Sequence, residues 1–167
     1  MTTGALRWTD TTYKTIANRG GPTVSKFGQS GVIHYRSEIK FSNINDGSAK
    51  TYLIGEKFMS PYYYESLAPA GPAFYADNQG AWCGFEWDNH RIAWNPASTY
   101  LAEDFQPRQD FPGTDNPTFL AFGSAHPGSM NMAMCDGSVQ SISYDIDRDT
   151  HRYLAYRLDD RSVTLEP

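Results

Sequence analysis

Residues 126–144 read HPGSMNMAMCDGSVQSISY, and their alternation of apolar and polar residues around an Asp-Gly pair decides the fold. Asp136 and Gly137 separate two runs of strand character, which is the strongest short-range signal of a β-hairpin. A two-residue type I′ turn at these positions needs positive φ at both residues, which favours the Asp-Gly pair. With this turn, Cys135 is expected to pair with Ser138, and the two strands run antiparallel away from it.

The alternation within this hairpin also predicts which side chains face the core, because successive side chains of a strand point to opposite faces. In this register one face carries four apolar residues, which we assign to the core: Met130, Met132, Met134 and Val139. Ile142 falls on the opposite face, so either a bulge intervenes or both faces are partly covered.

Strand patterns also occur before the hairpin. Residues 31–41 (GVIHYRSEIKF) and 51–58 (TYLIGEKF) are rich in β-branched and aromatic residues and predict two strands, joined through a loop or a single helical turn over residues 43–50. Residues 81–94 (AWCGFEWDNHRIAW) predict a further strand. Residues 95–117 contain four prolines and predict a long loop.

A short helix is predicted after the hairpin. Asp147 is a suitable N-cap, and Leu154 and Leu158 are one helical turn apart, so a helix of about two to three turns should follow. The chain is therefore predicted to be an α+β domain of mostly antiparallel strands with one short C-terminal helix.

The composition describes one globular domain. The 167 residues include 14 Gly, 10 Pro, 4 Trp, 11 Tyr and 9 Phe, which excludes a disordered chain and a coiled coil. The net charge of −5 argues against nucleic acid as a partner, because phosphate contacts need clustered Lys and Arg. No apolar stretch reaches the ~20 residues of a membrane helix, so no membrane contact is expected here. We expect an irregular N-terminal segment over residues 1–30 and a single domain over residues 31–167.

The hairpin stretch also resembles a known family. His126 is followed, after nine residues, by Asp136 and Gly137, and this spacing is similar to the His-x9-Asp-Gly ending of the bacterial prepilin-type processing-associated family. Four further blocks resemble that family in the same order: residues 31–58, 80–94, 107–113 and 151–160. The resemblance covers about residues 31–160.

This resemblance implies a fold, a compartment and partners. Members typically carry a prepilin signal and a long hydrophobic helix, so the chain is expected to be the soluble C-terminal part: a pilin- or pseudopilin-like globular domain without the membrane helix of the full-length form. Export by machinery like that of type IV pili or type II secretion implies an extracellular or cell-surface location. Neighbouring pilin-like subunits or the secretion machinery are the implied partners. The family is of unknown function with an older solute-binding label, and a non-enzymatic structural subunit is the expected function.

The residues of the family motif are expected to serve structure. An extended strand over residues 129–135 rises about 3.3 Å per residue, so His126 and Asp136 should lie on the order of 20–30 Å apart, too far to share a proton. Asp136 and Gly137 are required by the turn. His126 is expected to pin the start of the strand to a neighbouring loop, or to mark an interface between subunits.

Metal binding has one candidate. Asp145, Asp147 and Asp149 alternate as in calcium loops, although Thr150 and Tyr156 stand where an EF-hand-like loop needs Gly and Glu. The alternative is that these carboxylates cap a helix and face water. Zinc is not expected, because the four histidines are scattered and the two cysteines are far apart in the sequence. Apart from calcium, no cofactor is expected.

Cys83 and Cys135 are candidates for a disulfide, which an oxidising compartment would preserve, and two buried thiols are the alternative. Trp82, Trp87 and Trp94 are candidates for stacking on sugars, with part of them expected in the core. An extracellular carbohydrate- or solute-binding module that uses exposed aromatic residues is therefore the alternative function.

A catalytic carboxylate pair is the remaining hypothesis. Glu56 and Glu86 would suit glycoside chemistry if they lay about 5–10 Å apart. A buried salt bridge with Lys57, Arg91 or Arg36 is the favoured interpretation of these residues, and we expect the protein not to be an enzyme.

Overall fold

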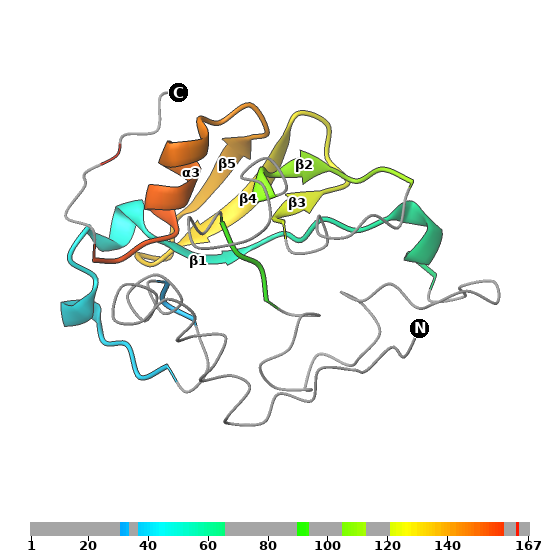
Figure 1. Ribbon diagram of the computed structural model, residues 1–167. Helices are drawn as coiled ribbons and strands as arrows, with labels where there is room; N and C mark the ends of the chain where they lie inside the picture. Colours follow the sequence, from blue (N-terminus) through cyan, green and yellow to red (C-terminus); the bar gives the residue numbers. More distant parts are fainter. Residues whose placement is uncertain are drawn as a thin grey trace, which may run out of the picture.

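The computed structural model describes residues 31–33, 37–65, 90–93, 105–112, 121–158 and 163. Their main element is an antiparallel three-stranded sheet of β1 (Tyr52–Gly55), β4 (Ser129–Met134) and β5 (Val139–Ser143), in the order β1-β4-β5 (Figure 1). Helix α3 (Arg148–Leu154) follows β5. These elements confirm the predicted α+β fold of mostly antiparallel strands with one helix.

A second, smaller sheet extends the first. It pairs β2 (Arg108–Gln109) with β3 (Gly123–Ser124) in parallel. Three short 3-10 turns complete the described elements: η1 (Phe41–Asn43), η2 (Ser48–Lys50) and η3 (Pro61–Tyr63). Strand β2 lies within residues 95–117, where the sequence predicted only a loop, because its partner strand is distant in the sequence.

The hairpin forms where it was predicted, but its loop has three residues rather than two. Gly137 N–H donates to the Met134 carbonyl (3.0 Å), and Met134 N–H donates to the Ser138 carbonyl (2.8 Å). Cys135, Asp136 and Gly137 therefore form the loop, and the predicted pair of Cys135 with Ser138 is wrong. Gly137 has φ 88°, the left-handed conformation that closes a three-residue hairpin loop.

This longer loop shifts the register by one residue and decides the core. Met130 lies opposite Ile142, and Ala133 lies opposite Val139. Ile142 is 1% exposed and Val139 is 68% exposed, so the assignment of Val139 to the core is wrong. The main core cluster consists of six buried residues: Tyr52, Met130, Met132, Met134, Ile142 and Leu154.

Helix α3 begins where the sequence predicted. The Asp147 side chain accepts a hydrogen bond from Thr150 N–H at 2.8 Å, which satisfies one of the free amides at the helix start. The helix spans seven residues, and its last residue, Leu154, packs on the sheet. Leu158 lies beyond this end and is 48% exposed. None of the described residues form a helix that is long and apolar enough to cross a membrane.

Two predicted strands are not found in their described parts. Residues 37–40 have no regular structure. At the end of this stretch Asn43 binds back to Lys40: its side chain accepts from Lys40 N–H (3.0 Å) and its N–H donates to the Lys40 carbonyl (2.8 Å). Residues 90–93 are also irregular. The rest of the predicted strand over 81–94, and the predicted segment over 1–30, lie outside the described residues.

Candidate functional site

Glu56 lies where the chain passes from the larger sheet to the smaller one. Its N–H donates to the Asn131 carbonyl of β4 (3.2 Å), whereas its carbonyl accepts from Gly123 N–H of β3 (3.1 Å). Because that carbonyl is turned to β3, Asn131 N–H needs another acceptor. The Glu56 side chain supplies it, with Oε2 at 2.6 Å. Glu56 therefore joins the two sheets through both its main chain and its side chain.

His126 binds the other oxygen of the same carboxylate. His126 Nε2 lies 3.3 Å from Glu56 Oε1, with 57% and 35% of the two side chains exposed. Glu56 thus pairs with His126, a partner that the sequence did not predict, because the bend before β4 carries the imidazole to the end of β1. Arg36, one of the predicted partners of Glu56, lies outside the described residues. His126 holds the start of β4, although its partner follows a strand instead of lying in a loop.

Tyr144 fixes the loop that carries His126. Its hydroxyl lies 2.9 Å from the His126 carbonyl and 2.9 Å from Ser124 Oγ. Ser124 Oγ accepts a hydrogen bond from His126 N–H at 3.1 Å. The Ser124 hydroxyl therefore binds the main chain of His126, while the imidazole of His126 faces Glu56. His126 and Asp136 lie at opposite ends of β4. The motif residues therefore act on separate parts of the hairpin.

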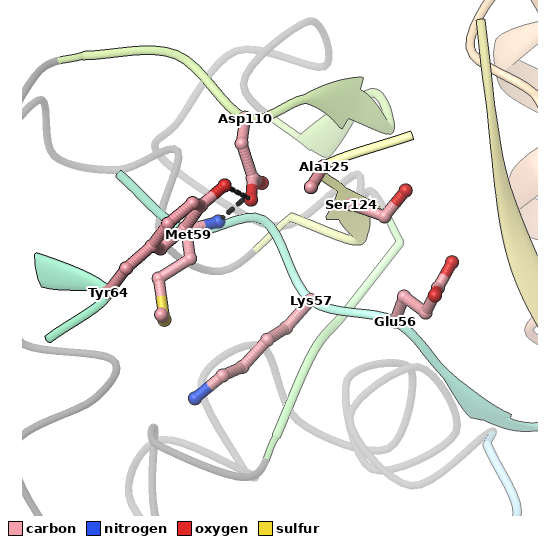
Figure 2. A pocket seen from close by; sticks show the side chains of 7 residues that line it. All are labelled: Glu56, Lys57, Met59, Tyr64, Asp110, Ser124 and Ala125. Carbon is pink, nitrogen blue, oxygen red and sulfur yellow. Dashed lines mark hydrogen bonds between the residues drawn. The ribbon is translucent and has the colours of Figure 1, made fainter. Parts of the chain in front are cut away.

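A pocket of about 300 Å³ opens beside this junction (Figure 2). Figure 2 shows Asp110 and Tyr64 at one end and Glu56 at the other, with the Lys57 side chain extending away from Asp110. The lining consists of seven residues: Glu56, Lys57, Met59, Tyr64, Asp110, Ser124 and Ala125.

Asp110 organises one end of this pocket. Its carboxylate accepts from Met59 N–H (2.8 Å) and from the Tyr64 hydroxyl (2.5 Å). Burial, followed by the hydrogen bond to Asp110 and its negative charge, raises the pKa of Tyr64 to about 12. Tyr64 therefore stays a phenol at neutral pH and donates to the carboxylate. The pocket offers carboxylate oxygens as acceptors and an aromatic ring, which suits hydrogen-bonding ligands.

Comparison with known proteins gives a family for this chain. A family model described as a protein of unknown function, DUF1559, matches residues 2–149. The chain belongs to the DUF1559 family. No curated protein and no solved structure matches it. The matched range contains Glu56, Asp110 and His126, and the DUF1559 description assigns no activity, so the function has to be argued from the geometry.

The calcium candidates of this DUF1559 chain are not brought together. Asp147 caps α3, and Asp149 faces Arg152 at 3.7 Å on the same helix. Asp145 N–H donates to the Ser143 hydroxyl. Among the described residues, no group of three or more His, Cys, Asp or Glu side chains suits a metal ion.

The cysteine and aromatic candidates are only partly described. Cys135 is a buried free thiol whose Sγ lies 3.6 Å from the Tyr52 carbonyl, so no bridge is formed at this residue in the structure. Burial, followed by the charge of Asp136, raises the pKa of the Cys135 thiol. Five candidates lie outside the described residues: Trp82, Cys83, Glu86, Trp87 and Trp94.

Sequence analysis missed two residues that shape this site, Asp110 and Tyr144. Their roles depend on contacts between segments that are distant in the chain, such as the 46 residues between Tyr64 and Asp110. The sequence held one signal for Asp110, because this residue belongs to the block 107–113, which the sequence analysis compared with the prepilin-type family.

Proposed function

We propose that this protein is a non-enzymatic, exported structural subunit, the pseudopilin-like globular head of an assembly at the cell surface. The observation that carries the proposal is an apolar row across the outer face of the larger sheet. Ile54, Ala133 and Val139 are neighbours on β1, β4 and β5, on the face opposite the buried methionines. Ile54 is 63% exposed and Val139 is 68% exposed. Exposed apolar side chains that adjoin one another mark protein contact surfaces.

The contacts of the motif residues His126 and Gly137 support a structural role. Gly137 closes the hairpin loop, and His126 and Glu56 connect β1 with the start of β4. Their hydrogen bonds hold the chain together. Export and the neighbouring pilin-like subunits or secretion machinery come from the family resemblance, and the apolar row is the surface on which such neighbours would pack.

Cysteine cross-linking on intact cells tests this proposal. In the full-length protein, Val139→Cys treated with a membrane-impermeant bis-maleimide should form species larger than the monomer, because position 139 faces a neighbour outside the cell. Tyr62→Cys is the matched control, since Tyr62 is 65% exposed but lies on η3, away from the row. Equal cross-linking of both variants contradicts the contact surface, and absence of labelling of both contradicts export. The unsubstituted chain measures the background from its own cysteines.

An extracellular carbohydrate- or solute-binding module is the second candidate, favoured by the pocket between Asp110 and Glu56. Carboxylates beside an exposed aromatic ring are suited to sugar hydroxyl groups and to stacking. If this function holds, the melting temperature should rise with a ligand from a panel of neutral and amino sugars. Asp110→Asn should remove that rise, whereas Ile54→Ser, outside the pocket, should keep it. No rise with any sugar of the panel argues against this candidate.

A further inference from the structure

Strand β5 is an edge of the larger sheet, and its outward main-chain amides have no partner within the described part of the chain. Tyr144 N–H donates to the Gly128 carbonyl at 3.1 Å, which places the even-numbered residues of β5 in hydrogen bonds with β4. The amides of the odd-numbered residues point to the open edge: Val139, Ser141 and Ser143. The side chains of the same three residues are exposed.

This edge lacks the features that normally prevent strand addition. Natural edge strands carry charged residues, proline or bulges that block pairing with another chain. Strand β5 reads Val-Gln-Ser-Ile-Ser, without charge or proline, and its register with β4 is regular over its five residues. An added strand would find amides that no described residue binds, and small or apolar side chains, along the whole of β5.

Three carboxylates flank β5, and the nearest basic residue along the chain, Arg148, lies beyond the last of them. Asp136 precedes the strand, and Asp145 and Asp147 follow it, with no Lys or Arg between residues 136 and 147. All three carboxylates are exposed. Two hydrogen bonds from Ser138, at 2.7 and 2.9 Å, hold Asp136 beside the start of β5 and lower the pKa of its carboxyl.

These acidic ends argue against a second copy of β5 as the added strand. An antiparallel pair centred on Ser141 would place Asp136 of one copy opposite Ile146 of the other, between Asp145 and Asp147, and like charges close together across paired strands are destabilising. A symmetric pair would also close a dimer, whereas a contact between different surfaces can continue into an open assembly.

We propose that the β5 edge binds an extended segment of a partner chain in which about five uncharged residues are flanked on both sides by Lys or Arg. The length of the uncharged stretch follows from β5, which offers five residues at about 3.4 Å each for pairing, with Asp136 three positions before the strand and Asp145 two positions after it. The inference rests on the proposed structural function, since it states the chemistry of the neighbour that the subunit contacts.

Amide hydrogen exchange with synthetic peptides tests the edge. The probe is the acetylated and amidated peptide Lys-Thr-Val-Thr-Val-Thr-Lys, and the matched control has Glu at both ends. The lysine peptide should slow exchange at Val139, Ser141 and Ser143. The amides of Gln140 and Ile142 already bind β4, so their exchange should not change. The glutamate peptide should bind at least about tenfold more weakly.

Two variants make the test specific. Ser141→Pro removes one outward amide without removing a bond to β4, and proline is tolerated on edge strands, so binding of the lysine peptide should be lost while Ser141→Thr keeps it. If Ser141→Pro disturbs folding, Asp145→Lys gives an independent test. This substitution should weaken binding of the lysine peptide about tenfold and strengthen binding of the glutamate peptide.

The outcomes separate this inference from the proposed function. No protection by the lysine peptide at millimolar concentration, equal binding of both peptides, or a dimer that protects the same three amides overturns the edge proposal. Cross-linking through Val139→Cys on cells would still support the structural subunit in that case. Conversely, peptide binding without any cross-linking through Val139→Cys would support the β5 edge as a binding site and contradict the proposal that the protein is a subunit of an assembly.

Discussion

Lowering the pH from about 7 to about 4 should remove about 3 kcal/mol from the free energy of unfolding through one side chain, His151. His151 lies on α3 and is 2% exposed, between the sheet and the helix. Its Nδ1 is 3.3 Å from the Tyr52 hydroxyl, and the Phe122 ring lies edge-on at 5.7 Å. Its Nε2 is buried and has no hydrogen-bond partner among the residues that the structure describes. Burial lowers the pKa of His151 from 6.5 to about 4.

The direction of this effect follows from proton binding. Between pH 6.5 and about 4 the unfolded chain binds a proton at His151, whereas the folded protein keeps the ring neutral. Protonation therefore favours the unfolded state, and stability falls as the pH falls through this window. Hydrogen bonds lower the pKa values of Asp136 and Asp147 below their ordinary value of 3.8, so these carboxyls titrate below it.

Urea unfolding at several pH values between 4 and 7 measures the effect. The control is the double variant Tyr52→Phe with His151→Leu, which removes the imidazole without leaving the buried Tyr52 hydroxyl unpaired. Its stability should change much less across the window than that of the parent chain. Equal slopes for the two proteins would show that His151 is not the buried neutral group described here.

Gly123→Ala should destabilise the protein by about 3 kcal/mol, which corresponds to about 6–12 °C in Tm for a chain of this length. A Cβ at position 123 would lie 2.2 Å from the Arg108 carbonyl oxygen and 3.0 Å from Phe58 Cα. Both obstacles include main-chain atoms, so no rotation of a side chain relieves them. The contact with Arg108 lies inside the β2–β3 pair, which has only two residues in each strand.

Gly31→Ala is the matched control for this substitution. A Cβ at position 31 would meet its nearest atom, the Ala155 carbonyl oxygen, at 3.5 Å, which is ordinary contact. The free energy of unfolding of this variant should stay within about 0.5 kcal/mol of the parent. Thermal and urea unfolding of both variants measures the difference, and similar losses in the two would contradict the close packing of β3 on β2.

The hairpin shows how far local sequence can predict this fold. The Asp136-Gly137 pair correctly located the hairpin, because few residues other than glycine adopt the left-handed conformation that a tight loop needs. The loop length was not predicted, since a three-residue loop also uses glycine at its last position. One residue of register then moved Ile142 into the core and Val139 out of it.

The candidate site was less predictable than the fold. His126 stood out through its spacing to Asp136, but its partner, Glu56, is far from it in sequence and was interpreted as a partner of basic residues. Glu56 has this role because its own carbonyl is turned to Gly123, which leaves Asn131 N–H to the side chain. Such an exchange of partners arises only when β1, β3 and β4 meet.

Turn chemistry, helix capping and the alternation of the methionines act over a few residues, and so the local sequence was enough to locate the hairpin, the start of α3 and the buried face of β4. The strand register, the small parallel sheet, the pocket beside Asp110 and the open edge of β5 required the folded chain. The small sheet, the pocket and the pairing of β1 with β4 depend on hydrogen bonds between segments that are distant in sequence, which the packed core brings together. The β4–β5 register depends on the length of one loop, which the Asp-Gly pair alone does not specify.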